Sequence, residues 1–423
     1  TNTKVTKTAS SIDQINIAAP NSNGLSHNKF SNYNVNTTGQ IINNFSGRTA
    51  SEIAAGSGSS AVTQTKIGGL VAANSNLSSS GSAKIILNEV TSNNVSQLLG
   101  YVEIAGTKAD LILANPNGIT CAGCGFINTA HLLMIAGSSN FDARGNLGFN
   151  LKGQANPNLY VPLITIDGLG LDVSRVSTTD IIASSVKLLS TIYGSDSASL
   201  TIKTGEGRYN YNNKSITEDG SSLTPTSHVF AIDASSLAKI QSGQIYLIAT
   251  KQGVGVNMEA EILASQVVNI DANGDVYYSA ISAGDSVNLK SSATIQGFDS
   301  DSIILAPNIT LQANQLNNFG NISAYNLNIK NGDSLNNSGY LEALDFKISN
   351  INNINNSGLI YGETTLNISG KNLTNNSIGS IFSPQSYSII LTGLLTNSGL
   401  VTSSNDLNIT ANQLGNSSEI SAA

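Results

Sequence analysis

Short stretches of alternating apolar and polar residues recur through the last hundred residues of the chain. They include Leu327-x-Ile329, Phe346-x-Ile348, Leu366-x-Ile368 and Leu407-x-Ile409. Alternation with a period of two is typical of a short strand that buries one face. The pattern therefore predicts many short strands in this region.

A glycine marks the same point of each unit in this region. The glycines are Gly320, Gly339, Gly358, Gly379 and Gly399, so successive units differ by 19, 19, 21 and 20 residues. An apolar residue follows each glycine by two positions, as listed here: Ile322, Leu341, Ile360, Ile381 and Val401. A unit of about 20 residues cannot bury its own apolar face, so neighbouring units must stack as a solenoid.

Two kinds of solenoid have repeats of this length. A leucine-rich repeat needs a return segment with further leucines or an amphipathic helix, whereas the returns here are rich in Asn, Ser and Gly. Asn and Gly suit the corners of a β-helix because both tolerate left-handed backbone, and stacked Asn side chains can hydrogen-bond between coils. We expect an all-β fold, a parallel β-helix, with coils stacked about 4.8 Å apart into a rod on the order of 100 Å long.

The repeat is interrupted between about residues 140 and 230. The segments 151–168 and 203–222 have the composition of hairpins and a long loop, and we interpret them as excursions from the coil. The stretch 178–193 would tolerate a helix, but its β-branched residues favour strands.

Composition and charge exclude several functional classes. The chain has 54 Asn and 59 Ser, 40% apolar and 11% charged residues, and a net charge of −7. This apolar share argues against disorder. No run of Lys or Arg is present, so nucleic acid and anionic membranes are poor partners. No apolar run approaches the ~20 residues of a membrane helix, and we expect a soluble protein.

The ends of the sequence give two further expectations. The first residues lack the charged-then-apolar pattern of a signal peptide, so a secreted protein would be present here in processed form. The last residues fall inside a repeat, so we expect the chain to be a fragment of a longer protein.

A turn motif stands at Asn115-Pro116-Asn117-Gly118-Ile119. Asn at the first position, Pro at the second and Gly at the fourth are typical of a type I turn. This spacing alone indicates a tight corner between two strands.

The stretches around this turn resemble a known family. They are ANPNGITCAGCGFINT at 114–129, NSNGLSHNKFSNYNV at 21–35, FDARGNL at 141–147, GLDVSR at 170–175 and FAIDASSLAKIQSGQIYLIATKQGVGV at 230–256. Together they resemble the secretion domain of two-partner-secretion exoproteins: filamentous haemagglutinins, ShlA/HpmA-type haemolysins and contact-dependent growth-inhibition proteins. Several motifs in the expected order are far more specific than one.

The resemblance implies a fold and domain organisation. It implies a right-handed parallel β-helix with an N-terminal cap and extra-helical β-hairpins. Residues 1–290 would form the secretion domain, and residues 291–423 the first repeats of a filamentous shaft.

The resemblance also implies a function. Periplasmic POTRA domains of an outer-membrane β-barrel transporter would bind the domain, and the protein would reach the medium or the cell surface as a monomer. The segments tied to secretion would be residues 115–119 and, in the first stretch, Asn21, Asn23, Gly24, Leu25, Ser26, His27, Asn28 and Phe30. The whole protein would be a carrier of a growth-inhibition toxin or a haemolysin, with an adhesin as the alternative. Its effector and its binding of a target-cell receptor would lie beyond residue 423.

Cys121 and Cys124 are the two cysteines of the chain. Thioredoxin-like chemistry needs a βαβ unit, and zinc needs two further ligands, whereas His27, His131 and His228 are scattered. In an exported protein a local disulfide or a pair of packed thiols at a corner fits better. We expect no metal and no cofactor.

A polysaccharide-degrading β-helical enzyme is the remaining alternative. It would need paired carboxylates on neighbouring coils. Asp299 and Asp301, or Asp167 and Asp172, are close in sequence, but neither pair has the Arg, Tyr and Trp of a sugar cleft nearby. Asp271 to Asp275 resembles a calcium loop without its later Glu. Surface turns explain all of these, and we expect no catalytic residues.

Overall fold

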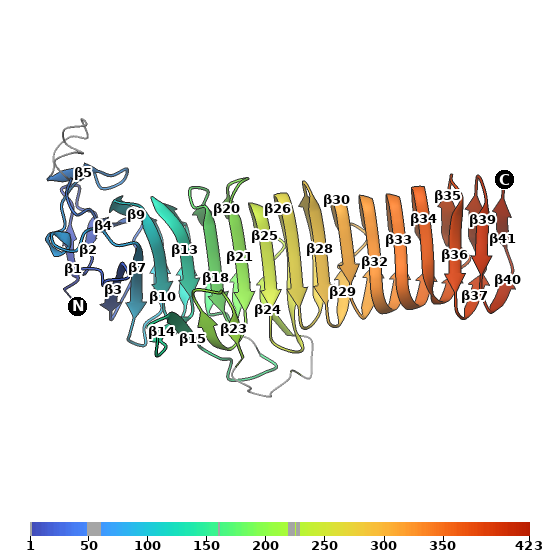
Figure 1. The fold of residues 1–423 in the computed structure, drawn as a ribbon, viewed down its shortest axis with the longest axis horizontal. Helices are drawn as coiled ribbons and strands as arrows, with labels where there is room; N and C mark the ends of the chain where they lie inside the picture. The colour runs from blue at the N-terminus through green and yellow to red at the C-terminus, as the bar shows by residue number, and fades with distance from the viewer. Residues whose placement is uncertain (1, 49–60, 160, 219–224, 226–228) are drawn as a thin grey trace. The chain divides into compact units, whose positions relative to one another are not determined.

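The computed structural model describes residues 2–48, 61–159, 161–218, 225 and 229–423 of the 423-residue chain. Its regular elements are almost entirely β-strands (Figure 1), and the helical element in the described part is one 3-10 turn, η1 (Ser75–Leu77). This confirms the all-β prediction. Among these residues no helix has both the length and the apolar character to cross a membrane.

The chain forms two compact units. The first comprises residues 1–223 and 240–243, and the second comprises residues 224–239 and 244–423. Each is built as a right-handed parallel β-helix in which a strand pairs with the equivalent strand of the next coil. The partition does not fall at residue 290, so the expected domain boundary stays a prediction.

The strands of the first unit's coils come from three short segments per turn. They are β2 (Asp13–Asn16), β3 (Leu25–Phe30), β4 (Gln40–Asn44), β7 (Ile85–Val90), β8 (Ser96–Leu98), β9 (Tyr101–Gly106), β10 (Ala109–Ala114), β11 (Ile119–Cys121), β12 (Cys124–Ile127), β13 (Thr129–Ile135), β16 (Ile164–Ile166), β17 (Leu171–Val173), β18 (Thr178–Ala183), β19 (Val186–Leu188), β20 (Ile192–Gly194) and β21 (Ser199–Thr204). Residues 178–193 are thus strands, as predicted.

The first coil carries the expected N-terminal cap. Strand β1 (Lys4–Lys7) runs antiparallel to β2, with Lys4 opposite Asn16, whereas β2 pairs in parallel with β4. Its side chains are exposed. Because β1 occupies the outer edge of β2, that edge is not left as a template for pairing with another chain.

The extra-helical hairpins form two small antiparallel sheets. One consists of β5 (Val62–Gln64) and β6 (Leu70–Ala72), and the other of β14 (Gly137–Phe141), β15 (Leu147–Leu151), β22 (Gly207–Asn210) and β23 (Ile216–Thr217). In the larger one, the covering sheet, Phe149 and Tyr209 are fully buried against coil residues such as Leu87 and Leu133. The covering sheet therefore shares a hydrophobic core with the coils.

The interruption is narrower than the sequence pattern indicated. Residues 164–204 return to regular coils, and among the described residues the excursions are the covering sheet, its connections and the β5–β6 hairpin. Two separate insertions, at 137–163 and 207–218, shift the spacing between equivalent strands. The coils between these insertions are therefore not recognisable from the spacing of the sequence. The β5–β6 hairpin was not predicted because the sequence around it shows no regular repeat.

The second unit is the more regular one. Its strands are β24 (Val229–Ala234), β25 (Lys239–Ala249, partly in the first unit), β26 (Val254–Ala272), β27 (Val276–Ala283), β28 (Ser286–Ser291), β29 (Thr294–Gly297), β30 (Ile303–Gln312), β31 (Gln315–Asn318), β32 (Asn321–Asn337), β33 (Tyr340–Asn356), β34 (Leu359–Asn375), β35 (Ser380–Ser383), β36 (Tyr387–Leu391), β37 (Leu394–Asn397), β38 (Leu400–Ser403), β39 (Leu407–Thr410), β40 (Gln413–Asn416) and β41 (Glu419–Ala422).

Strand register confirms the repeat length in this unit. Asn321 of β32 lies opposite Tyr340 of β33, a step of 19 residues, and Ser380 of β35 lies opposite Leu400 of β38, a step of 20. The apolar residues that follow the glycines are all buried and stack from coil to coil. The glycines therefore mark the corner before a strand that faces the core.

A ladder of buried asparagines runs through the corners of the second unit. Asn318, Asn337, Asn356, Asn375 and Asn397 are at most 2% exposed. The Nδ2 of each donates to the Oδ1 of the next at 2.8 to 2.9 Å, and Asn397 donates in the same way to Asn416. Each Nδ2 also donates to a backbone carbonyl of the following coil, such as Asn337 to Leu359 at 3.0 Å. The predicted coil-to-coil stacking of Asn side chains is confirmed.

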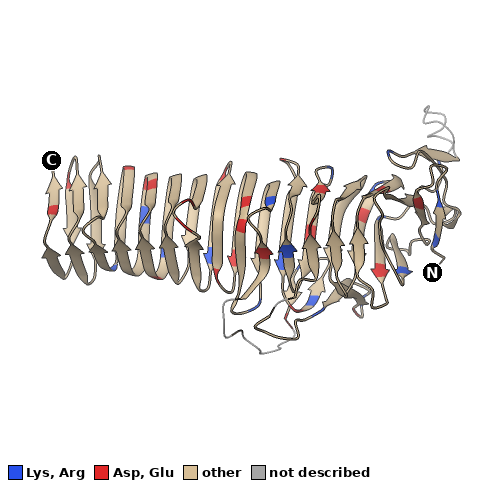
Figure 2. Ribbon diagram, turned by 180° about the vertical axis from the view of Figure 1, so that it is seen from behind, with Lys and Arg blue, Asp and Glu red and all other residues tan. Residues whose placement is uncertain are grey.

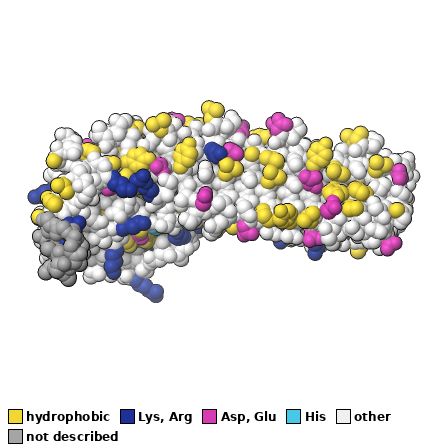
Figure 3. All heavy atoms as spheres, turned by 90° about the horizontal axis from the view of Figure 1, so that it is seen from above, with side chains coloured by type: hydrophobic (Ala, Val, Ile, Leu, Met, Phe, Trp, Pro, Cys, Tyr) yellow, Lys and Arg dark blue, Asp and Glu magenta, His cyan; other side chains and the backbone are white. Residues whose placement is uncertain are grey.

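The two units differ in charge. The first holds 14 Lys and Arg against 13 Asp and Glu, a net charge of +1, and the second holds 6 against 14, a net charge of −8. Charged residues are sparse along the strands (Figure 2), and on the face in Figure 3 the basic side chains gather over the first unit. The overall acidity thus belongs to the second unit.

Replacing Asn356 by Ala should lower the free energy of unfolding by about 2 kcal/mol. The buried Oδ1 of Asn375 would lose its donor, and the buried Nδ2 of Asn337 would lose its acceptor. Urea denaturation followed by circular dichroism measures this change. The matched control is Asn367→Ala, an exposed asparagine whose loss should cost less than about 0.5 kcal/mol. Equal effects of the two substitutions would show that the ladder contributes no more than a surface contact.

Candidate functional site

The Asn115 to Ile119 motif forms the tight corner that its spacing predicted. The Gly118 amide donates to the Asn115 carbonyl at 3.1 Å, and the Asn117 amide donates to the Asn115 Oδ1 at 2.9 Å. Gly118 has a φ of +117°, and a Cβ there would lie 2.8 Å from the Leu163 carbonyl oxygen. Only glycine meets both requirements, because a side chain would strain the backbone and collide with the next coil.

The side chains of this corner are held by the loop that precedes β8. The Nδ2 of Asn115 donates to the Asn94 carbonyl at 2.9 Å and to the Ser96 Oγ at 3.0 Å. The Nδ2 of Asn117 donates to the Ser92 carbonyl at 2.6 Å. Both asparagines therefore act as clamps between two neighbouring coils.

The same loop also contacts the other motif stretch. The Nδ2 of Asn94 donates to the Ser31 carbonyl at 3.1 Å, and the Ser92 hydroxyl donates to that carbonyl as well. The Gln97 amide donates to the Asn34 Oδ1 at 2.8 Å. Residues 92–97 thus join the segment 21–35 to the corner at 115–119, which are 80 or more residues apart in sequence.

The first motif stretch opens with a turn of the same design. The Gly24 amide donates to the Asn21 carbonyl at 2.8 Å, the Asn23 amide donates to the Asn21 Oδ1 at 3.0 Å, and Gly24 has a φ of +81°. Strand β3 begins directly after it, at Leu25. An Asn-x-Asn-Gly sequence therefore sets the entry of the chain into both strands.

The β3 side chains mostly complete the interior of the first coils. The Ser26 hydroxyl donates to the Ala18 carbonyl at 2.7 Å, and the Asn28 Oδ1 accepts from the Ala18 amide at 2.9 Å. Leu25 joins the core under the covering sheet, and the Phe30 ring packs edge-on against Tyr33 at 5.3 Å. These residues therefore stabilise the first coils from within.

Exposure separates the motif residues into three groups. Leu25, Ser26, Asn28, Asn115, Gly118 and Ile119 are buried; Gly24, His27, Phe30, Pro116 and Asn117 are partly buried; Asn21 and Asn23 are exposed. In the folded domain, only the last two and parts of the middle group can reach a partner. The motifs thus act mainly by shaping the corners.

Sequence reasoning missed a third turn of this kind. In Asn156-Pro157-Asn158-Leu159 the Leu159 amide donates to the Asn156 carbonyl at 3.2 Å and the Asn158 amide to the Asn156 Oδ1 at 2.9 Å. This is the bonding pattern of the other two turns. The repeated Asn-Pro-Asn letters were the signal that could have revealed it.

Two histidines pair with buried carboxylates beneath the covering sheet. The Nε2 of His27 lies 2.8 Å from the Oε2 of Glu89, whose Oε1 accepts from the Ser139 amide of β14 at 2.8 Å. Burial alone would raise the pKa of Glu89, but the bonds from His27 and Ser139 outweigh it and hold the pKa below its usual range. The motif residue His27 therefore helps to fasten the covering sheet.

The second pair lies further along the same face. The Oδ2 of Asp180 lies 2.8 Å from the Nε2 of His131 and 2.8 Å from the Nζ of Lys214, which precedes β23. Burial would raise the pKa of Asp180, yet the hydrogen bonds and positive charge of His131 and Lys214 lower it. Both carboxylates are thus stabilised in the ionised form.

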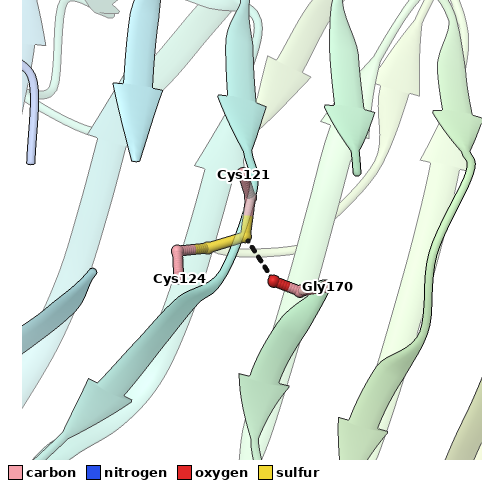
Figure 4. Close-up of a disulfide and its surroundings, with 3 residues drawn as sticks. All are labelled: Cys121, Cys124 and Gly170. Carbon is pink, nitrogen blue, oxygen red and sulfur yellow. Dashed lines mark hydrogen bonds between the residues drawn. A yellow bond between two sulfur atoms is a disulfide. The ribbon is translucent and has the colours of Figure 1, made fainter. Parts of the chain in front are cut away.

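Cys121 and Cys124 form a disulfide (Figure 4) that closes the corner between β11 and β12, with the Cα atoms 5.4 Å apart. Both residues are at most 1% exposed. The Cys121 Sγ lies 3.2 Å from the Gly170 carbonyl oxygen of the next coil, a polar contact, since a disulfide sulfur has no hydrogen to donate. Of the two arrangements that the sequence left open, the structure contains the disulfide.

Three of the four carboxylates of the enzyme alternative lie in turns, and Asp172 lies in strand β17. The Asp299 Oδ1 accepts from the Asp301 amide at 2.9 Å, and the Asp167 Oδ1 accepts from the Gly168 amide at 2.7 Å. The expectation that no Tyr or Arg lies near was wrong for Asp172, whose Oδ2 accepts from the Tyr101 hydroxyl at 2.6 Å. Burial would raise the pKa of Asp172, but the bonds from Ser174 and Tyr101, together with the charge of Arg175, hold it below its usual range. Tyr101 comes from another coil, which the sequence separation concealed.

The residues considered for metal binding are not brought together in the described part of the chain. No group of three or more His, Cys, Asp or Glu side chains there could hold an ion. Asp271 contacts Lys290, and Asp275 accepts from the Thr294 amide at 3.0 Å. His27 and His131 bind different carboxylates, and His228 lies outside the described residues.

The β-helix described above is similar to a solved domain. The crystal structure of the filamentous hemagglutinin secretion domain is similar to this chain, with a TM-score of 0.58 and 25% sequence identity, over 74% of this chain and 95% of that one. The class is therefore that of β-helical secretion domains.

The chain belongs to the two-partner-secretion family, because the model of the TPS secretion domain matches residues 1–278. Among curated relatives, the tRNA nuclease CdiA of Escherichia coli strain NC101 is 36% identical over 272 residues, and Toxin CdiA of Yersinia pestis is 36% identical over 262 residues. These matches cover 63% and 62% of this chain, but the chain spans about 7% of the length of either relative.

Family membership confirms the central prediction from the sequence. The chain contains a two-partner-secretion domain, and such a domain has an outer-membrane transporter as its partner. Exoproteins of this family are exported through that transporter.

The depressed pKa values of Glu89 and Asp180 predict acid destabilisation. A carboxyl whose pKa is lowered by folding stabilises the fold above its unfolded pKa of about 4, and this stabilisation is lost as the pH falls through the folded value. We expect the melting temperature to be nearly constant from pH 7 to about 5 and to fall below about pH 4. Thermal unfolding followed by circular dichroism measures this.

The variant Glu89→Gln/Asp180→Asn should melt lower at neutral pH and show a shallower decline in acid. Asp301→Asn, an exposed carboxylate in a turn, is the matched control and should leave the pH profile unchanged. A double variant with the parent's acid profile would show that these two carboxylates do not cause the decline.

Proposed function

We propose that this chain is the secretion signal and folding nucleus of a contact-dependent growth-inhibition toxin carrier. The POTRA domains of its transporter recognise it in the periplasm. One observation carries this proposal: two family-like stretches far apart in sequence are clamped by the loop 92–97 into one surface region of the first coils. A periplasmic domain of the transporter could therefore bind the two stretches at one place on the surface.

The identity of the carrier is inferred from the curated relatives. The reported relatives bear the names Toxin CdiA and tRNA nuclease CdiA, which supports a toxin carrier over a haemolysin. The similarity to the filamentous hemagglutinin secretion domain keeps a haemagglutinin-type adhesin as the alternative. Toxin activity and receptor binding would belong to parts of the whole protein other than this region.

The role of this region is binding and folding rather than catalysis. Its family is one of secretion domains, and the acidic pairs considered above serve turns. We further infer that it acts as a monomer without a cofactor and is exposed at the cell surface or released after export. The same proposal includes the domain boundary at about residue 290, with the secretion domain before it and the first repeats of the filamentous shaft after it.

Replacing Asn115 and Asn117 together by Val should reduce export about tenfold or more, because the corner loses the bonds that join it to the loop 92–97. The measurement is the amount of exoprotein in the medium of cells that express the cognate transporter. Asn405→Val, at an exposed corner of the second unit, is the control and should be exported normally.

Unchanged export of the double variant would leave the motif as an ordinary corner. Circular dichroism of the purified variants distinguishes a lost signal from general misfolding. A variant that folds but is not exported would support direct recognition of this corner.

Deleting residues 310–423 should preserve recognition by the transporter, whereas deleting residues 1–40 should abolish it. In a solenoid each coil contacts only its neighbours, so the first deletion removes one end of the stack. The second removes the cap strand β1 and the turn at Asn21. Pull-down by the periplasmic domains of the transporter compares the two, and the opposite order of binding would contradict the proposed placement of the signal.

A further inference from the structure

A basic hollow lies on the first unit, beside the β5–β6 hairpin. It has a volume of about 610 Å³, and its walls include Lys66, Lys108, Arg175, Gln64, Asn128 and Glu103. The three cationic side chains are exposed. In a first unit with a net charge of only +1, three cations around one hollow are a local concentration of positive charge.

Glu103, the acidic residue of the wall, offsets only one of the three positive charges. Glu103 is 4% exposed, and its two carboxylate oxygens accept from the backbone amides of Lys66 and Ile67 at 2.8 to 2.9 Å. Its charge is therefore already engaged by backbone donors. Its role is to hold the β5–β6 connection against the coils, which places Lys66 at the rim.

The cations are spaced by the coils themselves. Lys108 lies in the corner between β9 and β10, Asn128 in that between β12 and β13, and Arg175 in that between β17 and β18. Strands β9, β12 and β17 pair in succession, so these corners belong to three consecutive coils. At about 4.8 Å per coil, the Lys108 and Arg175 backbones are roughly 10 Å apart along the stack.

The hollow also has a strand beside it. Thr63 and Gln64 of β5 contribute to its wall, and in the described part of the chain β5 pairs with β6 alone. The Thr65 amide donates to the Gly69 carbonyl, and the Ala73 amide donates to the Ala61 carbonyl. Hydrogen-bonded and non-hydrogen-bonded pairs alternate along an antiparallel ladder, so the pair next to Thr65, Gln64 with Leu70, is not hydrogen-bonded. The Gln64 peptide groups therefore face the edge of β5 that is opposite to β6.

Together these features fit an extended acidic polypeptide. An extended segment can add to a strand edge through its backbone, while side chains give specificity. Carboxylates two to four residues apart on such a segment are separated by about 7 to 13 Å, which matches the spacing of the corner cations. A guanidinium and two ammonium groups supply charge-assisted hydrogen bonds to them.

We propose that the basic hollow is the docking surface for an acidic, extended segment of the transporter's periplasmic domains. This rests on the proposed function, since it names the surface through which the partner is bound. Opposite charge speeds the encounter and selects the partner. The hollow also explains why the domain can bind an acidic partner although the whole chain is acidic.

The test uses the full chain, the purified periplasmic domains of the cognate transporter as the probe, and biolayer interferometry at several salt concentrations. The variant Lys66→Gln/Lys108→Gln/Arg175→Gln should bind about tenfold more weakly at low salt and show less dependence on salt. The variant Lys152→Gln/Lys347→Gln/Lys371→Gln removes the same charge from exposed sites elsewhere and should bind like the parent. Melting curves confirm that both variants fold.

Each other outcome has its own meaning. Equal binding by the parent and the hollow variant would overturn this inference alone, whereas no binding by the parent would overturn the proposed function as well. Phosphatidylglycerol vesicles form the second arm. The polypeptide proposal is wrong if the vesicles bind the parent but not the hollow variant, while the parent and the hollow variant bind the periplasmic domains equally. In that case the hollow is a lipid-binding site.

Discussion

Parallel pairing between consecutive coils is the constraint on which the rest of the structure depends. A coil can satisfy its backbone groups only if the next coil brings an equivalent strand to the same place, which requires a nearly constant number of residues per turn. The steps of 19 to 21 residues meet this requirement. Between β33 and β34 the step changes from 19 residues at Ala343 to 20 at Asp345 and returns to 19 at Ile351, so an irregularity is absorbed within a single coil. Because this alignment places equivalent residues of consecutive coils opposite one another, it also produces the apolar stacks, the asparagine ladder and the repeated corners.

The same constraint explains where the candidate signal is found. Strands are fixed by pairing, so variation is tolerated at corners, and the two Asn-x-Asn-Gly turns, at Asn21 and Asn115, lie between strands of the first unit. Asn115 and Asn117 hold the neighbouring loop through their side-chain amides, which donate to the Asn94 and Ser92 carbonyls. Under the proposed function, a transporter that binds this surface would respond to the folded register of the first coils.

The structure could be predicted from the sequence where the sequence repeats, and not where it does not. The corner glycines and the residues two positions later recur, so the coil length and the buried stacks of the second unit could be derived. Residues 164–204 could not, because insertions on both sides removed the spacing. The pairing of His27 with Glu89, and of Tyr101 with Asp172, joins residues 62 and 71 positions apart, and no local pattern carries that information. The turn at Asn156 was within reach, since its letters repeat those of Asn115.

The asparagine ladder of the second unit has a direction. At every step the amide nitrogen of one coil faces the amide oxygen of the coil that follows it in sequence, from Asn318 to Asn416. The amide dipoles therefore align head to tail and reinforce one another. A side chain turned the other way would set two nitrogens or two oxygens face to face at one interface. The orientation adopted at the first rung is thus inherited by every later rung, so the stack carries a polarity that no single coil could define.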